Sequence, residues 1–343
     1  MVVTDLASFI NLVIFVVGNC SLPVYIVVVI VLIARKRHLR SSFFSLSIAC
    51  GAADIGFLVF RLLMRNFASI LYYELEWIRP IIESTPYQTA NAMIISWGIY
   101  FAQVMGVFLI SINRFTALWW PTQFKSIWSK KVMLGAVAFQ WAWTLPFSLP
   151  LLHPCCHCTL STNVSFRPKI MNAEISNLFW TLDIVLEGFI LTPVLIVLHI
   201  LMIYKIIQHT KKQKAMSQKE KQGGVNMAAE MRLTVIGVTL CSLYMFLVVN
   251  YVYYWWFGKY YSPIQALANA FVHMLFTSSN PFLLILFSTK FRSVFCNFVS
   301  CGRYTDDKVG PMGKSDRSVS ARKSFSQAHT DDRRRSSVMN PPQ

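Results

Sequence analysis

Residues 89–115, TANAMIISWGIYFAQVMGVFLISINRF, are the stretch of sequence that decides the fold of this protein. The stretch contains no charged side chain before Arg114. The hydrocarbon core of a bilayer is about 30 Å thick, and about 20 apolar residues in helical form cross it. We therefore predict a membrane-spanning helix that ends at the polar pair Asn113 and Arg114.

Further apolar runs of the same kind accompany this one along the 343 residues of the chain. We expect seven spanning helices, near residues 9–34, 43–64, 89–112, 132–152, 177–204, 233–257 and 263–288. Pro146 and Pro150 interrupt the fourth run and Pro281 the seventh, but neighbouring helices can satisfy the carbonyl groups that a proline leaves without a donor. The composition agrees, since 55% of residues are apolar, 14% are charged and mean hydropathy is +0.48. The expected fold class is an all-α membrane protein, a seven-transmembrane helix bundle.

Basic side chains are segregated between alternate loops, and this segregation predicts the orientation. Most of the 32 lysines and arginines follow the first, third, fifth and seventh runs, and the net charge is +17. Because basic loops stay in the cytosol, we place the amino terminus outside and the carboxyl terminus inside. We assign the excess charge to topology and to contact with anionic membrane lipid. Nucleic acid is not an expected partner, since the chain has no zinc-finger or RNP pattern.

The loop between the fourth and fifth runs is predicted to lie outside. Asn163 begins a glycosylation sequon, Asn-Val-Ser, in this loop. Cys155, Cys156 and Cys158 are disulfide candidates, because an outside loop lies in an oxidising compartment. Two neighbouring histidines make a metal site the alternative, but adjacent ligands rarely reach one tetrahedral zinc ion together. We expect at least one disulfide here, and neither a metal nor a cofactor.

An arginine ends the third run, and Pro121 follows seven residues later. A guanidinium group at the mouth of a helix bundle can hydrogen-bond across the bundle in one state and bind a partner's carbonyl groups in another. Asn113-Arg114-Phe115 with this proline resembles the D-R-Y motif of rhodopsin-like G-protein-coupled receptors. Further positions that match this family are Trp141, Asp54 after two alanines, and Asn280-Pro281. The resemblance covers residues 9–300 and implies a rhodopsin-like bundle in which these residues act in switching and G-protein coupling.

The chain also departs from that family pattern. Asn113 replaces the acid beside the arginine, Leu284 replaces a tyrosine, and residues 241–244 lack the usual proline of the sixth helix. No cysteine lies near Thr89, so the family's common disulfide to the third helix cannot form. Residues 111–118, followed by Pro121 and Ile127-Trp128, resemble nematode serpentine chemoreceptors of the class gamma group or its class V relatives.

This second resemblance implies a chemosensory receptor for small environmental or pheromonal molecules that activates a heterotrimeric G protein. It also implies a multi-pass protein of the plasma membrane, in the cilium of a sensory neuron. An enzyme is not expected, because the chain lacks H-E-x-x-H, G-x-S-x-G and a glycine-rich phosphate loop. The alternative is a ligand-gated channel or small-solute transporter, although the sequence shows no internal repeat of the kind that transporters have.

Ionisable side chains inside the apolar runs are costly in lipid and mark functional positions. Asp54 and Asn280 can meet in the bundle core, either as a switch or as a hydrated structural hydrogen bond. Asp183 and Glu187 lie four residues apart, on one face of the fifth helix. They can bind a cationic ligand, or they can pair with Arg61 of the second helix.

The helical period, counted from Arg114, places an inward stripe on the third helix. This stripe reaches the outer half of the bundle, where we expect a ligand cavity. Its residues are Gln103, Tyr100, Ser96 and the adjacent Trp97. Tyr251 and Trp255 of the sixth helix can line the same cavity, or they can belong to an aromatic belt at the lipid interface. His273 of the seventh helix is either a further lining residue or a packed core histidine.

The cytoplasmic side holds the remaining candidates. Glu230, near the start of the sixth helix, can pair with Arg114 in the resting state or stay a solvated acid. We expect a short amphipathic helix near residues 289–300 on the membrane surface, where Cys296 or Cys301 can be acylated. The chain then divides into a receptor domain, residues 1–300, and a disordered Ser/Arg-rich tail, residues 301–343. Kinases and arrestin are the expected partners of this tail.

Overall fold

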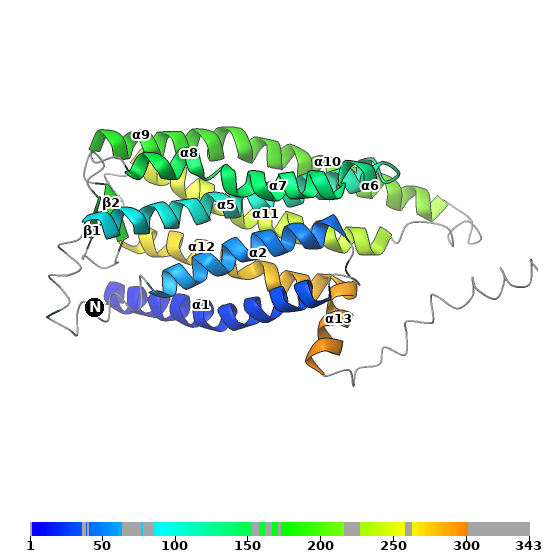
Figure 1. The fold of residues 1–343 in the computed structure, drawn as a ribbon, viewed down its shortest axis with the longest axis horizontal. Coiled ribbons are helices and arrows are strands. Elements are labelled where there is room, and N and C mark those ends of the chain that lie inside the picture. The colour runs from blue at the N-terminus through cyan, green and yellow to red at the C-terminus, as the bar shows by residue number, and fades with distance from the viewer. Residues whose placement is uncertain are drawn as a thin grey trace, which may run out of the picture. The chain divides into compact units, whose positions relative to one another are not determined.

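The computed structural model describes residues 2–35, 39, 41–63, 77, 86–152, 158–161, 167–170, 173–215, 227–257 and 263–300. The chain forms two units, Met1–Phe295 and Cys296–Gln343. The first unit contains a bundle of long helices that run side by side (Figure 1).

Six helices in the described part of the chain are long and apolar enough to cross a membrane. Their apolar portions are Leu12–Ala34, Ser42–Arg61, Ile94–Trp119, Glu174–Lys211, Arg232–Tyr253 and Ala268–Phe287. The helices themselves are α1 (Val2–Ala34), α2 (Ser42–Arg61), α5 (Pro86–Trp119), the continuous series α9 (Ala173–Asp183), η3 (Ile184–Leu191) and α10 (Thr192–Ala215), α11 (Met227–Phe257) and α12 (Pro263–Phe287).

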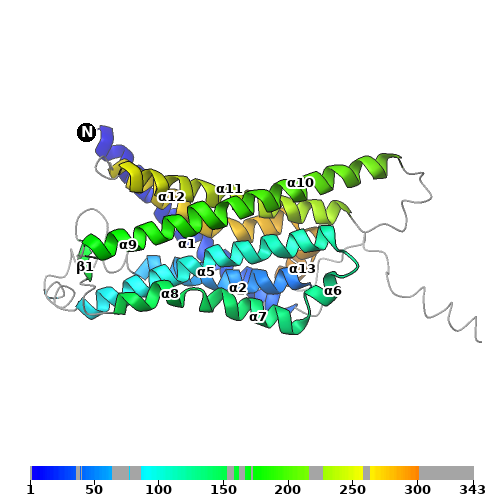
Figure 2. The same ribbon diagram turned by 90° about the horizontal axis from the view of Figure 1, so that it is seen from above.

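The fourth predicted span is a broken helix. It consists of α7 (Lys130–Ala142), the short helix α8 (Leu145–Ser148) and the 3-10 helix η2 (Leu149–Leu152), and these lie along α5 (Figure 2). Each break comes just before a proline, Pro146 in α8 or Pro150 in η2, since a proline removes one backbone donor and clashes with the preceding turn. Pro281, by contrast, lies inside the continuous helix α12. The prediction of a seven-helix bundle is therefore confirmed, with one of the seven rods in pieces.

Helix α5 is central to this bundle and packs against α2, α7, α10 and α11. It approaches two of these neighbours closely at Gly106, where an added Cβ would lie 2.9 Å from Gln140 Nε2 and 3.0 Å from Cys50 Sγ. The Gln140 side chain also donates a hydrogen bond to the carbonyl oxygen of Ala102, at 2.9 Å. The Gln140 and Cys50 side chains would have to move to admit a Cβ, so this crossing favours glycine.

The distribution of side chains is the reverse of that in a water-soluble protein. Large apolar residues point outward, and Leu134, Phe189 and Leu286 are 72%, 67% and 63% exposed. Polar residues such as Gln103 and Asp54 are buried in the interior. A lipid surrounding explains both facts, since it solvates apolar surface and makes unpartnered polar groups costly.

A two-stranded hairpin lies at the end of the bundle where α5 begins (Figure 1). Its strands β1 (Cys158–Ser161) and β2 (Arg167–Ile170) pair antiparallel, with Cys158 opposite Ile170. The sequence analysis did not predict these strands. We call this end of the bundle the hairpin end. Cys155, Cys156, Asn163 and the side chain of Cys158 lie outside the described residues, so the disulfide and the glycan stay predictions.

Two short helices follow α5 and α12. Helix α6 (Phe124–Ile127) comes after α5, and α13 (Thr289–Val299) comes after α12, where a short helix was expected. The Phe291 side chain of α13 is buried, and its backbone N–H donates to Ser288 Oγ at 3.2 Å. Cys296 is a partly exposed free thiol, whereas Cys301 and the tail lie outside the described residues. Acylation and the boundary at residue 300 stay predictions.

Candidate functional site

A buried polar network joins four helices around Asp54. Gln103 Nε2 of α5 donates to Asp54 Oδ1 at 2.7 Å and lies 3.2 Å from Thr277 Oγ1 of α12. The Tyr25 hydroxyl of α1 donates to Asp54 Oδ2, and Asn280 Nδ2 donates to that same hydroxyl at 3.1 Å. The sequence predicted that Asp54 and Asn280 meet, and the structure joins them through Tyr25.

Sequence reasoning missed Tyr25 and Thr277 as members of this network. Tyr25 follows Pro23 within a strongly apolar run, and a tyrosine in such a run is as typical of the lipid interface as of a core. The helical period did place Gln103 on the inward face of its helix, but a single helix gives no information about the partner that faces it. Pro281 follows Asn280 directly, so the network contacts α12 next to its proline.

The second group of residues lies near the carboxyl-terminal end of α5, away from the hairpin end. The guanidinium carbon of Arg114 is 4.0 Å from the ring centroid of Phe43 in α2, and both side chains are buried. Asn113 Nδ2 donates to Ser42 Oγ at 2.7 Å. The asparagine that replaces the family's acid therefore ties α5 to α2, and an aromatic face lies against the arginine through a cation–π contact. The side chain of Glu230 lies outside the described residues, so its pairing with Arg114 stays a prediction.

The segment after α5 is bound back to this group. Trp128 Nε1 donates to Thr116 Oγ1 at 2.7 Å, and the Thr116 hydroxyl donates in turn to the backbone carbonyl of Asn113 at 3.0 Å. Lys205 of α10 lies over the ring of Trp119, with 4.8 Å between Nζ and the ring centroid. These contacts make the end of α5, where Arg114 lies, a connected structural unit.

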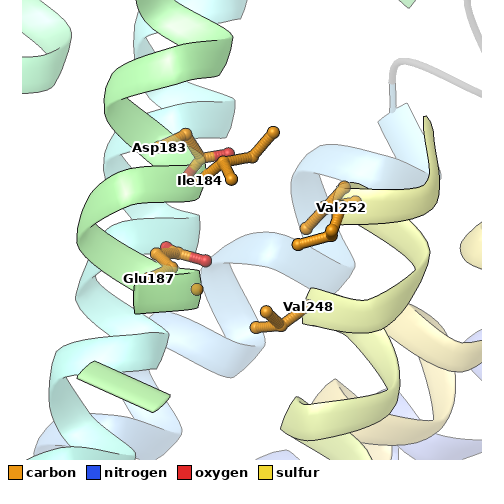
Figure 3. Close-up of a pocket in the computed structure, with 7 residues that line it drawn as sticks. Asp183, Ile184, Glu187, Val248 and Val252 are labelled. Carbon is orange, nitrogen blue, oxygen red and sulfur yellow. The ribbon is translucent and has the colours of Figure 1, made fainter. Parts of the chain in front are cut away.

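The third group is an acid pair, Asp183 and Glu187, in the half of the bundle nearer the hairpin. Both side chains are buried, with exposed fractions of 4% and 2%. The Tyr100 hydroxyl of α5 donates to Glu187 Oε2 at 2.5 Å. The pair borders a small recess, shown in Figure 3, between α11 and the continuous helix α9–η3 that carries the two acids. The lining residues are Asp183, Ile184, Glu187, Gly188, Val248, Tyr251 and Val252.

A π-helical turn positions the acid pair. Residues Ile184–Leu191 are π-helical, and Pro193 follows at the start of α10. Pro193 has no N–H to donate to the carbonyl group four residues earlier, so the preceding turn widens. Such turns occur frequently at functional sites. The sequence predicted a regular α-helix here, and the π-helical turn at Ile184–Leu191 corrects that prediction.

Aromatic rings surround the acid pair. Tyr251 lies 5.9 Å from both Tyr100 and Trp180, and Trp97 lies 5.8 Å from Trp180, measured between ring centroids. His273 packs between Tyr100, at 5.2 Å, and Phe57, at 4.2 Å. The structure thus brings most of the predicted ligand-pocket residues together and adds Trp180, which the sequence analysis did not single out.

Other predicted pocket residues have different positions. The guanidinium carbon of Arg61 lies 5.8 Å from the ring centroid of Phe57. The recorded partners of the two carboxyl groups are each other, Tyr100 and Tyr244. The pairing of Arg61 with the acids stays a prediction. Ser96 is half-buried, and the side chain of Trp255 lies outside the described residues.

The three groups are spaced along one helix. Tyr100 contacts the acid pair, Gln103 contacts the Asp54 network one turn further on, and Arg114 lies at the opposite end of α5. A small rotation or shift of α5 would therefore change contacts in all three groups at once.

Comparison with known families gives one match. Residues 13–301 match the sequence model of the family described as serpentine type 7TM GPCR chemoreceptor Srv. No curated protein matches the chain. The match begins within α1, extends past the end of α13 and includes all three groups of residues.

Proposed function

Because this chain belongs to the Srv family of serpentine-type seven-transmembrane GPCR chemoreceptors, we propose that it binds an extracellular small molecule and activates a heterotrimeric G protein. The ligand site is the half of the bundle nearer the hairpin, around Tyr100 and the acid pair. The coupling site is the opposite end, around Arg114. The protein is a multi-pass membrane receptor, and we place it in the plasma membrane.

The observation that carries this proposal is the position of Arg114. Its side chain is buried at the end of α5, and its guanidinium group lies against the ring of Phe43. A cation–π contact between desolvated groups contributes about 2 kcal/mol. This is enough to favour one arrangement of a two-state element without locking it, so a ligand with a preference for the other arrangement can release the arginine.

The Asp54 network supports a path between the two ends. It joins α1, α2, α5 and α12 through hydrogen bonds, and its Gln103 lies one turn from Tyr100. Buried polar networks of this kind have few alternative arrangements, because every unsatisfied group is costly in a low-dielectric interior. We therefore assign Asp54, Asn280 and Pro281 to the switch.

The proposal includes an orientation. The amino terminus of α1 lies at the hairpin end in both views (Figures 1 and 2), and we place that end outside the cell. The basic loops and the tail, residues 301–343, are then cytoplasmic, where they contact anionic lipid, kinases and arrestin.

The test is a second-messenger assay of the receptor expressed in cells and screened against small molecules. Arg114→Ala is expected to abolish basal and ligand-evoked signalling, with surface expression equal to that of the wild type. Arg35→Ala is the matched control, since Arg35 is an exposed arginine just beyond the end of α1. Normal coupling by Arg114→Ala would refute the assigned role. A ligand-evoked current that survives loss of G proteins would favour a channel instead.

A further inference from the structure

We propose that the acid pair recognises the ammonium group of a small aromatic amine. This inference rests on the proposed receptor function and names the chemical class of its ligand. It is carried by a cluster of buried oxygen atoms in the half of the bundle nearer the hairpin, for which the described chain records no cationic partner.

Three such oxygen atoms belong to side chains that interact with one another. Asp183 Oδ1, Glu187 Oε1 and the Tyr244 hydroxyl are buried, and their recorded partners are one another and Thr192, with no cationic side chain among them in the described residues. The Tyr244 side chain of α11 is in electrostatic contact with both carboxyl groups. Figure 3 shows both acids on the side of their helix that faces Val248 and Val252. Buried carboxyl groups are normally paired with a cation, so two of them together without a recorded cationic side chain require a reason.

An alkylammonium group matches this cluster. It has three N–H donors and one positive charge, and the cluster offers three oxygen acceptors, two of them on carboxyl groups. Two carboxylates side by side in a low-dielectric interior repel each other, and a cation relieves that repulsion. A divalent metal ion fits less well, since it requires more ligands. No group of three or more His, Cys, Asp or Glu side chains gathers anywhere in the part of the chain that the structure describes.

The side chains around the acid pair indicate that the rest of the ligand is aromatic. Tyr100 and Tyr251 stand edge to face, with an interplanar angle of 82°, and Tyr251 lines the same recess as the acids. Trp180 extends this aromatic wall from Tyr251, and Val248 and Val252 close the opposite side. Aromatic faces attract both a cation and a second aromatic ring. An arylalkyl amine matches the carboxyl groups and the aromatic wall together, and the recess, which has no room for a water molecule in this structure, must widen to admit it.

The experiment measures thermal unfolding of the full-length receptor purified in detergent, with no G protein present. Benzylamine and phenethylamine are the probes, and benzyl alcohol and phenethyl alcohol are their neutral counterparts. The amines are expected to raise the apparent Tm in a concentration-dependent way, as a ligand of the native state does. The alcohols are expected to leave it unchanged. Failure of both amines to raise the Tm of the wild type would overturn the proposal. The two carboxyl groups would in that case simply share a proton, with no ligand between them.

The variant that tests the site is Asp183→Asn combined with Glu187→Gln. Charged hydrogen bonds to the ammonium are lost, so its amine affinity is expected to fall about tenfold to hundredfold. Glu174→Gln is the matched control, because Glu174 is an exposed acid on the same helix; it should keep the wild-type Tm shift. An unchanged shift in the double variant would overturn the proposal.

A second variant keeps the test decisive if the double variant does not fold. Tyr244→Phe removes one acceptor oxygen without changing charge, and it is expected to weaken amine binding several-fold; equal affinity would contradict the site. The readout also separates the two proposals. An amine that stabilises the receptor but evokes no second messenger would refute G-protein activation alone, whereas a signalling receptor that no amine stabilises would refute this inference alone.

Discussion

Replacing Phe43 with leucine is expected to raise the basal signalling of the receptor. The change removes the aromatic face that lies 4.0 Å from the guanidinium carbon of Arg114, while it keeps an apolar side chain of similar size. Both groups are buried, so the lost cation–π contact is worth about 2 kcal/mol. Because about 1.4 kcal/mol is a tenfold change in an equilibrium constant, the release of Arg114 becomes about 30-fold more favourable. A receptor that is about 1% active at rest would rise to roughly 20% active.

The assay is ligand-free second-messenger output, normalised to the amount of receptor at the cell surface. Phe44→Leu is the control, since Phe44 is also buried in α2 and its ring packs against Phe43 with 5.3 Å between centroids. The control is expected to keep the wild-type basal output. Equal output from Phe43→Leu and the wild type would show that the contact does not restrain the arginine. A rise in both variants would attribute the effect to packing in α2 and would refute the cation–π argument.

Two further predictions concern the stability of the bundle, measured as the apparent Tm of the purified receptor. Tyr25→Phe removes a hydroxyl that bonds both Asp54 and Asn280; since hydrogen bonds between membrane helices contribute about 0.6 to 1.7 kcal/mol each, a stability loss of about 1–3 kcal/mol and a Tm lower by several degrees are expected. Tyr204→Phe is the control, because the Tyr204 side chain is 54% exposed, and it should leave the Tm unchanged. Equal Tm values for the two variants would show that the network does not stabilise the bundle. Gly106→Ala forces a Cβ to within 3.0 Å of Gln140 and Cys50 and is expected to cost about 1–3 kcal/mol. The same change at Gly135, where an added Cβ meets nothing within 4 Å, should be neutral or slightly stabilising, and a harmless Gly106→Ala would contradict the close crossing of the helices.

The sequence predicted the number of membrane-spanning helices better than the breaks and π-helical turns within them. Both the fourth and the seventh span contain prolines, but Pro146 and Pro150 lie near the starts of the short helices α8 and η2, whereas Pro281 lies in a continuous helix. The effect of a proline depends on whether neighbouring helices and side chains satisfy the carbonyl group that it leaves free. That is a property of the packed bundle. The π-helical turn before Pro193 was missed for the same reason.

The candidate site was predicted one residue at a time. Asp54, Arg114, Asp183 and Glu187 stand out in the sequence because a charged group is conspicuous and costly in an apolar run. Their partners do not stand out in this way. Phe43 and Tyr244 are ordinary members of apolar segments, and their roles come only from the side chains that they face.

By itself, the sequence determined that this protein is a bundle of membrane-spanning helices with charged positions at particular depths. The reason is that lipid imposes a strict requirement on each segment separately: about 20 apolar residues, with every exception costly. Only the tertiary structure decided which residues meet, because the rotation, depth and bending of each helix follow from its contacts with the others. The hydrogen bond of Tyr25 to Asp54, the contact of Phe43 with Arg114 and the position of Tyr244 beside the acid pair follow from packing, and the proposed switch and ligand site depend on them.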